Sequence, residues 1–152
     1  KPMNLLAILP QLLPSAIAWA QAQADHVATT GLPLSESGLG IAGRVGVRCP
    51  EQIRIKLVEQ LPMPEEPMLK EAAIQTGLLG PHMAGLTLGY SILICRSQDT
   101  VRLLSHECRH VYQYETLGSI AAFLPVYLQQ IATVGYDNAQ FEIDARAHEF
   151  SA

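Results

Sequence analysis

Residues 97–118 read "SQDTVRLLSHECRHVYQYETLG" and combine the signals of one long helix with a chemical motif. Ser97 or Asp99 can cap the start of this helix, and Gly118 can end it, because glycine readily adopts the left-handed conformation found just after helix C-termini. Residues 106–110 have the spacing H-E-x-x-H. The stretch therefore predicts a helix that carries two histidines and a glutamate near its middle.

The two histidines of this motif, His106 and His110, are four positions apart. Side chains with that spacing lie one above the other on a helix, as two ligands of one tetrahedral Zn²⁺ require. Zinc lowers the pKa of a bound water to about 7, and a neighbouring carboxylate such as Glu107 can take its proton. The pattern predicts a zinc site with Glu107 as general base. The alternative is a buried helix whose histidines are satisfied by hydrogen bonds.

A catalytic zinc site needs a third protein ligand. The residues that follow His110 lack the glycine and third histidine of the metzincin pattern, which excludes that subclass. Cys108 lies two positions from either histidine, so it points away from them and is expected to fill the core. A carboxylate on a later helix is the other known solution, and we expect such a helix from Asn138 to about Phe150. Its candidate carboxylates are Glu142, Asp144 and Glu149.

The segments before the motif helix contain the strand patterns of the chain. In "QIRIKLVEQL", residues 52–61, apolar and charged side chains alternate, which predicts a strand with one covered face. Residues 83–96, "MAGLTLGYSILICR", are rich in β-forming residues and predict two short strands with a turn near Gly89, or one bent strand. Between these segments, early prolines and the later Gly77 delimit a helix at 66–76.

Helices are expected on either side of this strand region. Ser35 can cap a short helix that ends near Gly46, and the segment after Ser119 is largely helical with a break or kink at Pro125. The order of elements predicts an α+β fold in which a small sheet of short strands packs on helices. We expect a single domain over residues 1–152 with three parts: N-terminal helices at 1–46, a strand, helix and strand region at 52–96, and the motif helix with C-terminal helices at 97–150.

The chain begins with an apolar stretch, residues 1–24, that resembles a signal peptide because it has a lysine, an apolar run and A-x-A triplets. Pro10 and Pro14 interrupt the run. We therefore expect an amphipathic helix at 15–30, with Pro14 at its start and Gly31 at its end. Since no segment has about 18 uninterrupted apolar residues, no membrane span is expected.

Composition narrows the class of partner and the compartment. The 152 residues are 49% hydrophobic and 16% charged, with a net charge of -4 and a pI of about 5.7, which argues against nucleic acid as the main partner. The three cysteines, an odd and widely spaced set, do not suggest a disulfide framework. A reducing compartment, and hence a cytoplasmic location, is expected.

Three stretches of this chain resemble the gluzincins, the zinc metallopeptidase clan that includes thermolysin. They are "GLTLGYSILI" as the strand region ahead of the site, "HECRHVYQYE" as the site helix and "FEIDAR" as a later glutamate helix. The compact layout resembles the bacterial minigluzincins, small single-domain proteins of mostly unassigned function. The resemblance covers residues 85–146, somewhat under half of the chain. It implies a zincin-like fold with an active-site helix and a C-terminal glutamate helix.

The resemblance also implies roles for individual residues. These are zinc ligands at His106, His110 and Glu142, and a general base at Glu107. Asp144 is the rival of Glu142 as third ligand. The residue four positions after Glu142 is Arg146, where larger gluzincins often carry an Asp that orients the first histidine. We therefore expect weaker metal affinity, or transfer of that orienting task to Asp144.

The cleft expected from this resemblance is incomplete. The chain ends ten residues after Glu142, without the helical subdomain that walls the cleft of larger gluzincins. We expect either a shallow cleft or one completed by the N-terminal helices, a partner protein or an oligomer. In particular, residues 4–13 or 15–30 should pack near the strand at 85–94 or near the motif helix and narrow access to the metal, because large apolar patches are uncommon on soluble monomers.

The expected function is zinc-dependent hydrolysis of a peptide or protein substrate, in which Glu107 activates a zinc-bound water. Tyr114, four positions after His110, is the preferred extra donor to the oxyanion, although such tyrosines also serve as packing residues. The other candidates for this donor are Tyr112, Tyr127, Tyr136 and His148. Two further hypotheses are a zinc-binding interaction or regulatory domain with a blocked cleft and a metal-free helical scaffold.

Overall fold

The computed structural model describes residues 3–151, and the predicted domain limits at residues 1 and 152 lie outside this range. Within it, the chain forms six α-helices and one four-stranded mixed sheet, which confirms the α+β class. The helices are α1 (Leu5–Thr30), α2 (Glu36–Arg44), α3 (Pro67–Thr76), α4 (Val101–Leu117), α5 (Ile120–Val134) and α6 (Gln140–Ala147). The strands are β1 (Leu32–Pro33), β2 (Arg54–Val58), β3 (Gly85–Leu88) and β4 (Ser91–Cys95).

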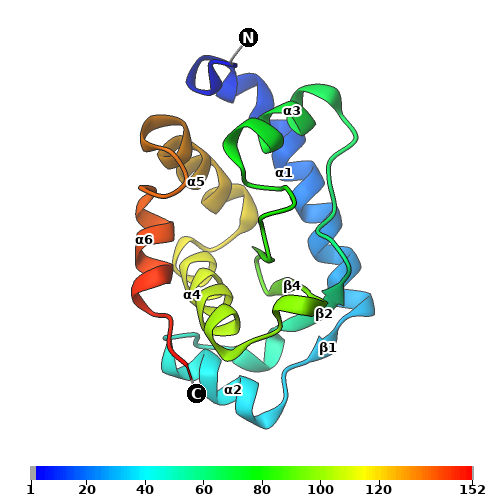
Figure 1. Ribbon diagram of the computed structural model, residues 1–152, viewed down its shortest axis with the longest axis vertical. Coiled ribbons are helices and arrows are strands. Elements are labelled where there is room, and N and C mark those ends of the chain that lie inside the picture. Colours follow the sequence, from blue (N-terminus) through cyan, green and yellow to red (C-terminus); the bar gives the residue numbers. More distant parts are fainter. Residues whose placement is uncertain (1–2, 152) are drawn as a thin grey trace.

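The elements are arranged along one long axis. Figure 1 shows α3 and the N-terminus at one end of this axis, and α2 with the C-terminus at the other. Helices α4, α5 and α6 lie together on one side of that view, and α1 crosses behind the middle of the molecule. Helix α1 contacts α3, α5 and the sheet, while α4 contacts α2, α5, α6 and β3. The motif helix therefore lies between the sheet edge and the C-terminal helices.

The sheet has the order β1-β2-β4-β3, so β3 is an edge strand. Strand β2 pairs with β4 in parallel, whereas β1–β2 and β3–β4 are antiparallel. The turn between β3 and β4 contains Gly89 at φ 66°, a left-handed conformation that glycine adopts without steric cost. The predicted pair of short strands at 83–96 is confirmed. A strand is also present within 52–61, but it covers only residues 54–58, and all five are half-buried rather than alternating between a covered and an exposed face.

Several predicted helix limits are confirmed by their capping contacts. The Ser35 hydroxyl accepts a hydrogen bond from the backbone N–H of Gly38, at the start of α2. The Glu66 carboxylate accepts bonds from the first turn of α3, and Gly118 ends α4 in the left-handed conformation. Because capping contacts involve residues only a few positions apart, they can be predicted from the sequence.

Other predicted limits are wrong. Helix α1 begins at Leu5 rather than at Ser15, and it contains both Pro10 and Pro14. Each proline removes one backbone donor from the helix. Both prolines lie on the exposed side of α1, while Leu9 and Leu12 are buried in a cluster with side chains of α3 and α5. This burial offsets the missing hydrogen bonds, and Asn4 caps the helix.

The limits of the two site helices also differ from the prediction. Thr100 caps α4, rather than Ser97 or Asp99, since residues 96–98 form a short 3-10 turn. Helix α6 covers only Gln140–Ala147, and Asn138 is not its cap. The last described residues therefore leave the helix before Phe150, which changes the direction in which Glu149 can point.

Helix α1 is long enough and apolar enough to span a membrane. Its most apolar 18-residue window has a mean hydropathy of 1.4, and 22% of that window is buried inside the protein. The bent pair α4 and α5, at 115°, meets the same criteria when taken together. Core helices of soluble proteins and signal sequences meet these criteria as well. The predicted absence of a membrane span stays a prediction.

Candidate metal centre

Helix α4 buries an unusual number of polar side chains. Along with the apolar Cys108 and Val111, which fill the core against the sheet, it buries both histidines of the motif and Glu107. The helix begins at the Thr100 cap and runs without interruption through the motif. The rings of His106 and His110 have centroids 4.9 Å apart, which confirms that the i,i+4 spacing places them side by side. Cys108 points into the core, as predicted.

A third side chain, Glu142 in the first turn of α6, contacts both histidines of this pair. Its Oε1 lies 3.1 Å from His106 Nε2, and its Oε2 lies 3.1 Å from His110 Nε2. Glu142 is 1% exposed. One ligand atom from each of these three residues lies within 4.8 Å of the others. This buried His-His-Glu group could hold a metal ion, and among the described residues Asp144 does not belong to it.

Stacked aromatic side chains hold α6 beside the motif helix α4. Phe123 of α5 stacks on Tyr114 of α4 at a centroid distance of 3.7 Å, and on Phe141 of α6 at 4.9 Å. Gly135 ends α5 at φ 85°, a conformation that few other residues adopt, and the chain reverses there. The first turn of α6 is thereby placed beside α4. Neither stack could be predicted from local sequence patterns.

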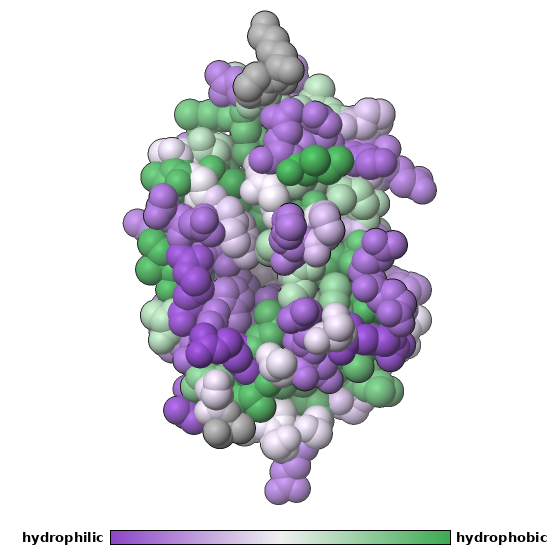
Figure 2. Space-filling view, in the orientation of Figure 1, coloured by the Kyte–Doolittle hydropathy of each residue, from purple (hydrophilic) through white to green (hydrophobic). Residues whose placement is uncertain are grey.

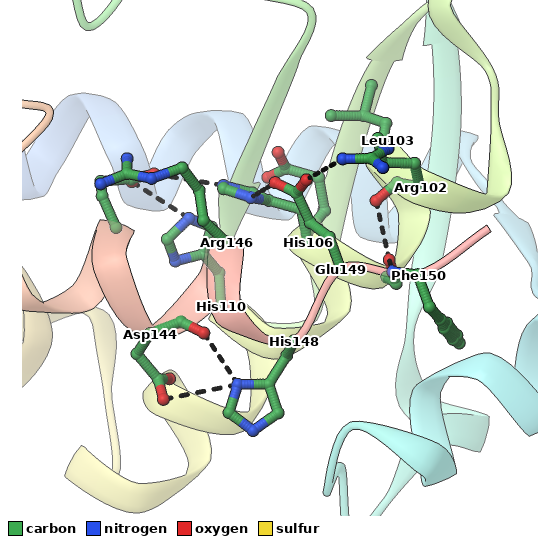
Figure 3. Close-up of polar contacts among 12 residues, drawn as sticks. Arg102, Leu103, His106, His110, Asp144, Arg146, His148, Glu149 and Phe150 are labelled. Carbon is green, nitrogen blue, oxygen red and sulfur yellow. Dashed lines mark hydrogen bonds and ion pairs between the residues drawn. The ribbon is translucent and has the colours of Figure 1, made fainter.

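The outer nitrogen of His106 has a carboxylate partner that the sequence did not predict. Nδ1 of His106 lies 2.7 Å from Oε2 of Glu149, whose Oε1 accepts a hydrogen bond from Arg102 (Figure 3). Arg146 stands where an orienting acid was expected, and its guanidinium donates to the backbone carbonyl of Asp137 instead. Glu149 follows the end of α6, so helical spacing rules could not assign it this position.

The outer nitrogen of His110 contacts the side-chain oxygen of Gln113, at 2.8 Å from Nδ1. The amide nitrogen of Gln113 donates to Asp144 at 2.9 Å and to the carbonyl of Phe141. Asp144 also accepts two bonds from the guanidinium of Arg109. Asp144, to which the orienting task was expected to pass as one of two alternatives, therefore does not contact the first histidine. It acts on the second, through Gln113.

These contacts determine which nitrogen of each ring can face a ligand. Glu149 and the Gln113 oxygen are acceptors, so each histidine holds its proton on Nδ1 and turns Nε2 toward Glu142. Two imidazole lone pairs and a carboxylate then converge on one buried point. This donor arrangement fits a divalent metal and needs a positive charge, either a metal or bound protons, to be stable.

The pKa values of the metal-free group follow from the same contacts. Burial lowers the pKa of His110, but hydrogen bonding and attraction to Glu142 outweigh it and raise the value to about 9. The pKa of His106 is raised by the same balance of burial against Glu142. Burial raises the pKa of Glu142, but the bonds from both histidines and Tyr127 hold it well below its usual range. Without metal, the group is a carboxylate that holds protons on its imidazole partners.

Glu107 is buried beside this group but is not part of it. Its Oε1 accepts a hydrogen bond of 2.7 Å from the hydroxyl of Thr87 on the edge strand β3. Gly85, two residues earlier, allows the close approach of β3, because a Cβ there would lie 2.8 Å from Glu107 Oε2. Alternation along β3 puts both residues on the face toward α4. The sequence predicted a strand here, but it did not predict the contact between Thr87 and Glu107.

The tyrosines near the site differ in their contacts. The hydroxyl of Tyr127 donates to Glu142 Oε2 at 2.7 Å. Tyr114, the tyrosine preferred from the sequence, is buried against Phe123, and burial raises its pKa strongly. It lines the same cavity as Glu107 and His110, but its contacts do not test a role as oxyanion donor, which stays a prediction.

An apolar cavity of about 110 Å³ adjoins the group. Glu107 and His110 contribute to its lining, and most other lining side chains come from α1, α3 and β3. Figure 2 shows a hollow near the centre of one face of the molecule. The prediction that an N-terminal segment packs against the 85–94 region is confirmed, since α1 contacts both β3 and β4. The chain matches no protein-family model, no curated protein and no solved structure.

Proposed function

We propose that this protein is a zinc-dependent hydrolase of the gluzincin type, similar to the minigluzincins, that cleaves peptide bonds. One observation carries the proposal. Two histidine Nε2 atoms and the Glu142 carboxylate converge in a buried group, while Glu107 lies beside that group and outside it. Ligands and general base would thus be separate residues, with His106, His110 and Glu107 on α4 and Glu142 on α6. The proposal includes a zincin-like fold, a peptide or protein substrate and a cytoplasmic location, the last supported by three free thiols.

The donor set favours zinc over calcium and magnesium. Two imidazoles and one carboxylate form a ligand set used by catalytic zinc sites, which keep a fourth position open. Calcium and magnesium prefer sites made only of oxygen ligands. A zinc ion held by His106, His110 and Glu142 would lower the pKa of a coordinated water and polarise a carbonyl oxygen.

Residues of the chain itself would transfer the proton and orient the two imidazoles. Glu107 would take the proton of the attacking water and later return it to the leaving amine. Thr87 holds Oε1 of this carboxylate, so Oε2 remains to accept the proton. Glu149 and Gln113 keep both imidazoles in the required tautomer and orientation. The burial of Glu107, at 4% exposed, limits competition from bulk water.

Metal analysis and a peptide assay test this function together. The purified chain should contain about one zinc and cleave members of a quenched-fluorescence peptide library. Glu107→Gln should keep its zinc and lose activity by about 10²–10⁴-fold, the usual contribution of a general base. Arg102→Gln, a change in an exposed outer partner, is the matched control and should keep most activity. Cleavage that survives in Glu107→Gln would refute the assigned mechanism.

The second candidate function is a metal-binding interaction or regulatory domain. The small cavity and its wall of α1 and α3 side chains favour this alternative, because they leave little room for a folded protein. Stoichiometric zinc in both the wild type and Glu107→Gln, with no cleavage of any library peptide by either, would support it over the hydrolase.

A further inference from the structure

We propose that Phe150 is a positioning residue of the candidate metal centre, because its contacts with α2 and α4 hold the neighbouring Glu149 against His106. Both Phe150 and Glu149 lie in the segment that follows α6, residues 148–151. The effect on zinc rests on the proposed function, in which His106 is a ligand. The placement of Glu149 against His106 can also be measured without metal.

The position of Glu149 is not determined by regular secondary structure. Helix α6 ends at Ala147, and the residues after it belong to no helix or strand. The backbone of such a segment samples many conformations unless contacts restrict it, and the restriction costs conformational entropy at every residue. Oε2 of Glu149 nevertheless lies 2.7 Å from Nδ1 of His106. Other contacts of the segment therefore have to fix its path.

The ion pair between Glu149 and Arg102 is a weak restraint on this path. The two side chains approach to 3.1 Å, but the side chain of Arg102 is 66% exposed. Exposed ion pairs contribute little, because water and salt screen the charges and the long side chain loses conformational freedom. The pair with Arg102 does not by itself account for the position of the Glu149 carboxylate.

Phe150 is held by two contacts that Glu149 does not share. Its backbone N–H donates at 3.2 Å to the hydroxyl of Ser105, a fully buried residue that directly precedes His106 in α4. Its ring lies against the guanidinium of Arg44, with 3.7 Å between Cζ and the ring centroid, which is a cation–π contact. Figure 3 shows the ring of Phe150 pointing away from the Glu149 carboxylate, which reaches His106.

These contacts connect α2 to the His-His-Glu group. Arg44 is the last residue of α2, and α2 packs on α4. Arg44 is outside the His-His-Glu group, so it can act on His106 only through Phe150 and Glu149. A substitution at Arg44 should therefore change the metal site in the same direction as one at Phe150, by a smaller factor.

Zinc affinity of the full chain, measured by competition with a chelating dye, tests this series of contacts. Phe150→Ala should weaken zinc binding by roughly tenfold, the lower limit for the loss of an outer partner. Phe150→Tyr keeps the ring and should restore the affinity. Arg44→Gln should cause a smaller loss. The matched control is Arg96→Gln, which removes a guanidinium paired with Glu59 at another surface and should leave the affinity unchanged.

A double-mutant cycle separates positioning from general destabilisation. In a Glu149→Gln chain, the added change Phe150→Ala should have no further effect on zinc affinity, because no carboxylate remains to be positioned. Equal losses in the wild-type and Glu149→Gln backgrounds would mean that Phe150 acts independently of Glu149, and would overturn the proposal.

Proton NMR of the chain in chelator measures the same placement without metal. A proton between an imidazole and a carboxylate gives a separate downfield signal, because the charge-assisted bond is short and slows exchange with water. The signal of His106 is identified by its loss in Glu149→Gln, and Phe150→Ala should weaken or broaden it. If Phe150→Ala fails to fold, as judged by its thermal transition, Ser105→Ala takes its place with the same expectation. A signal unchanged in the folded variant would overturn the proposal.

The two measurements distinguish this inference from the proposed function. A chain that binds no zinc but loses the His106 signal in Phe150→Ala would refute the zinc hydrolase and support the positioning role. A chain that binds zinc equally well in the wild type and in Phe150→Ala would keep the zinc site and refute the positioning role.

Discussion

The two sides of helix α4 use different physical means to form a site. On the side of α6, side chains are placed by a continuous set of hydrogen bonds, from Arg109 through Asp144 and Gln113 to His110. On the side of α1 and α3, a cavity is bounded by apolar side chains with no directional contacts of their own. The first side determines atom positions, and the second determines only a volume. Substitutions on the two sides should therefore affect different measurements.

The largest effect is expected at the centre of the hydrogen-bonded side. Glu142→Gln keeps the shape of the side chain but removes the charge that would balance two imidazoles and the proposed metal. Residues that contact a metal ligand, but not the metal itself, contribute up to roughly 100-fold to metal affinity. Loss of a ligand should therefore lower the zinc affinity by well over that factor. Isothermal titration with zinc measures this loss. Zinc affinity that stays within tenfold of wild type would exclude Glu142 as the third ligand.

On the apolar side, Leu12→Ala should act on stability alone. Leu12 is 3% exposed and lies in the cluster shared by α1, α3 and α5. Removing a buried leucine side chain costs about 2–5 kcal/mol of unfolding free energy. Denaturant unfolding measures this cost, and zinc affinity of the folded variant should change less than threefold. A large change in zinc affinity would show that the two sides are coupled.

The partner of His106 should have an intermediate effect. Glu149→Gln removes the carboxylate that accepts from Nδ1 but leaves the three proposed ligands in place. Outer partners of this kind are worth about 10–100-fold in metal affinity. Glu149→Gln should therefore weaken zinc by that factor with little change in unfolding free energy. Asp144→Asn provides the comparison at the other histidine. It should show a comparable loss of zinc affinity, because Asp144 acts on His110 through Gln113.

The contact between Thr87 and Glu107 should have a smaller effect, confined to rate. Thr87→Val keeps the shape of the side chain and removes the hydroxyl that donates to Glu107. A hydrogen bond to a charged group contributes about 1.5–3 kcal/mol, or roughly 10–100-fold. Cleavage should slow by about the lower of these factors, and zinc content should not change. Thr87→Ser should restore activity, and failure of that rescue would point to a packing role.

The last prediction concerns pH and the metal-free chain. The folded pKa of His110 is raised from 6.5 to about 9, so its contribution is fully present below pH 6.5 and is lost as pH rises through 9. The folded pKa of Glu142 is lowered from 4.5, so its contribution is present above pH 4.5 and is lost as pH falls below that value. In chelator, the melting temperature should therefore decline between pH 6.5 and 9.

Saturating zinc should remove this decline, because metal binding requires the imidazoles without their Nε2 protons and is favoured as pH rises. Thermal melts in chelator and in zinc, over the same buffers, measure the two trends. Parallel trends in the two conditions would contradict the assignment of the histidines as ligands.

The chain illustrates which parts of a site are accessible from sequence. The pairing of His106 with His110, the burial of Cys108 and the helix end at Gly118 follow from rules that act over one or two turns, and all were predicted. The start of α1 was not, because Pro10 and Pro14 suggest a break and only burial against α3 and α5 keeps the helix continuous.

The sequence by itself determined that two histidines would share one helix face, because the period of an α-helix requires it. It also narrowed the third member of a possible metal-binding group to three carboxylates. Only the tertiary structure decided among them: Glu142 meets both Nε2 atoms, Glu149 meets Nδ1 of His106, and Asp144 meets Arg109. Those outcomes depend on how α6 docks on α4, more than 30 positions away along the chain. Docking follows from packing of aromatic side chains from three helices, for which no local pattern exists.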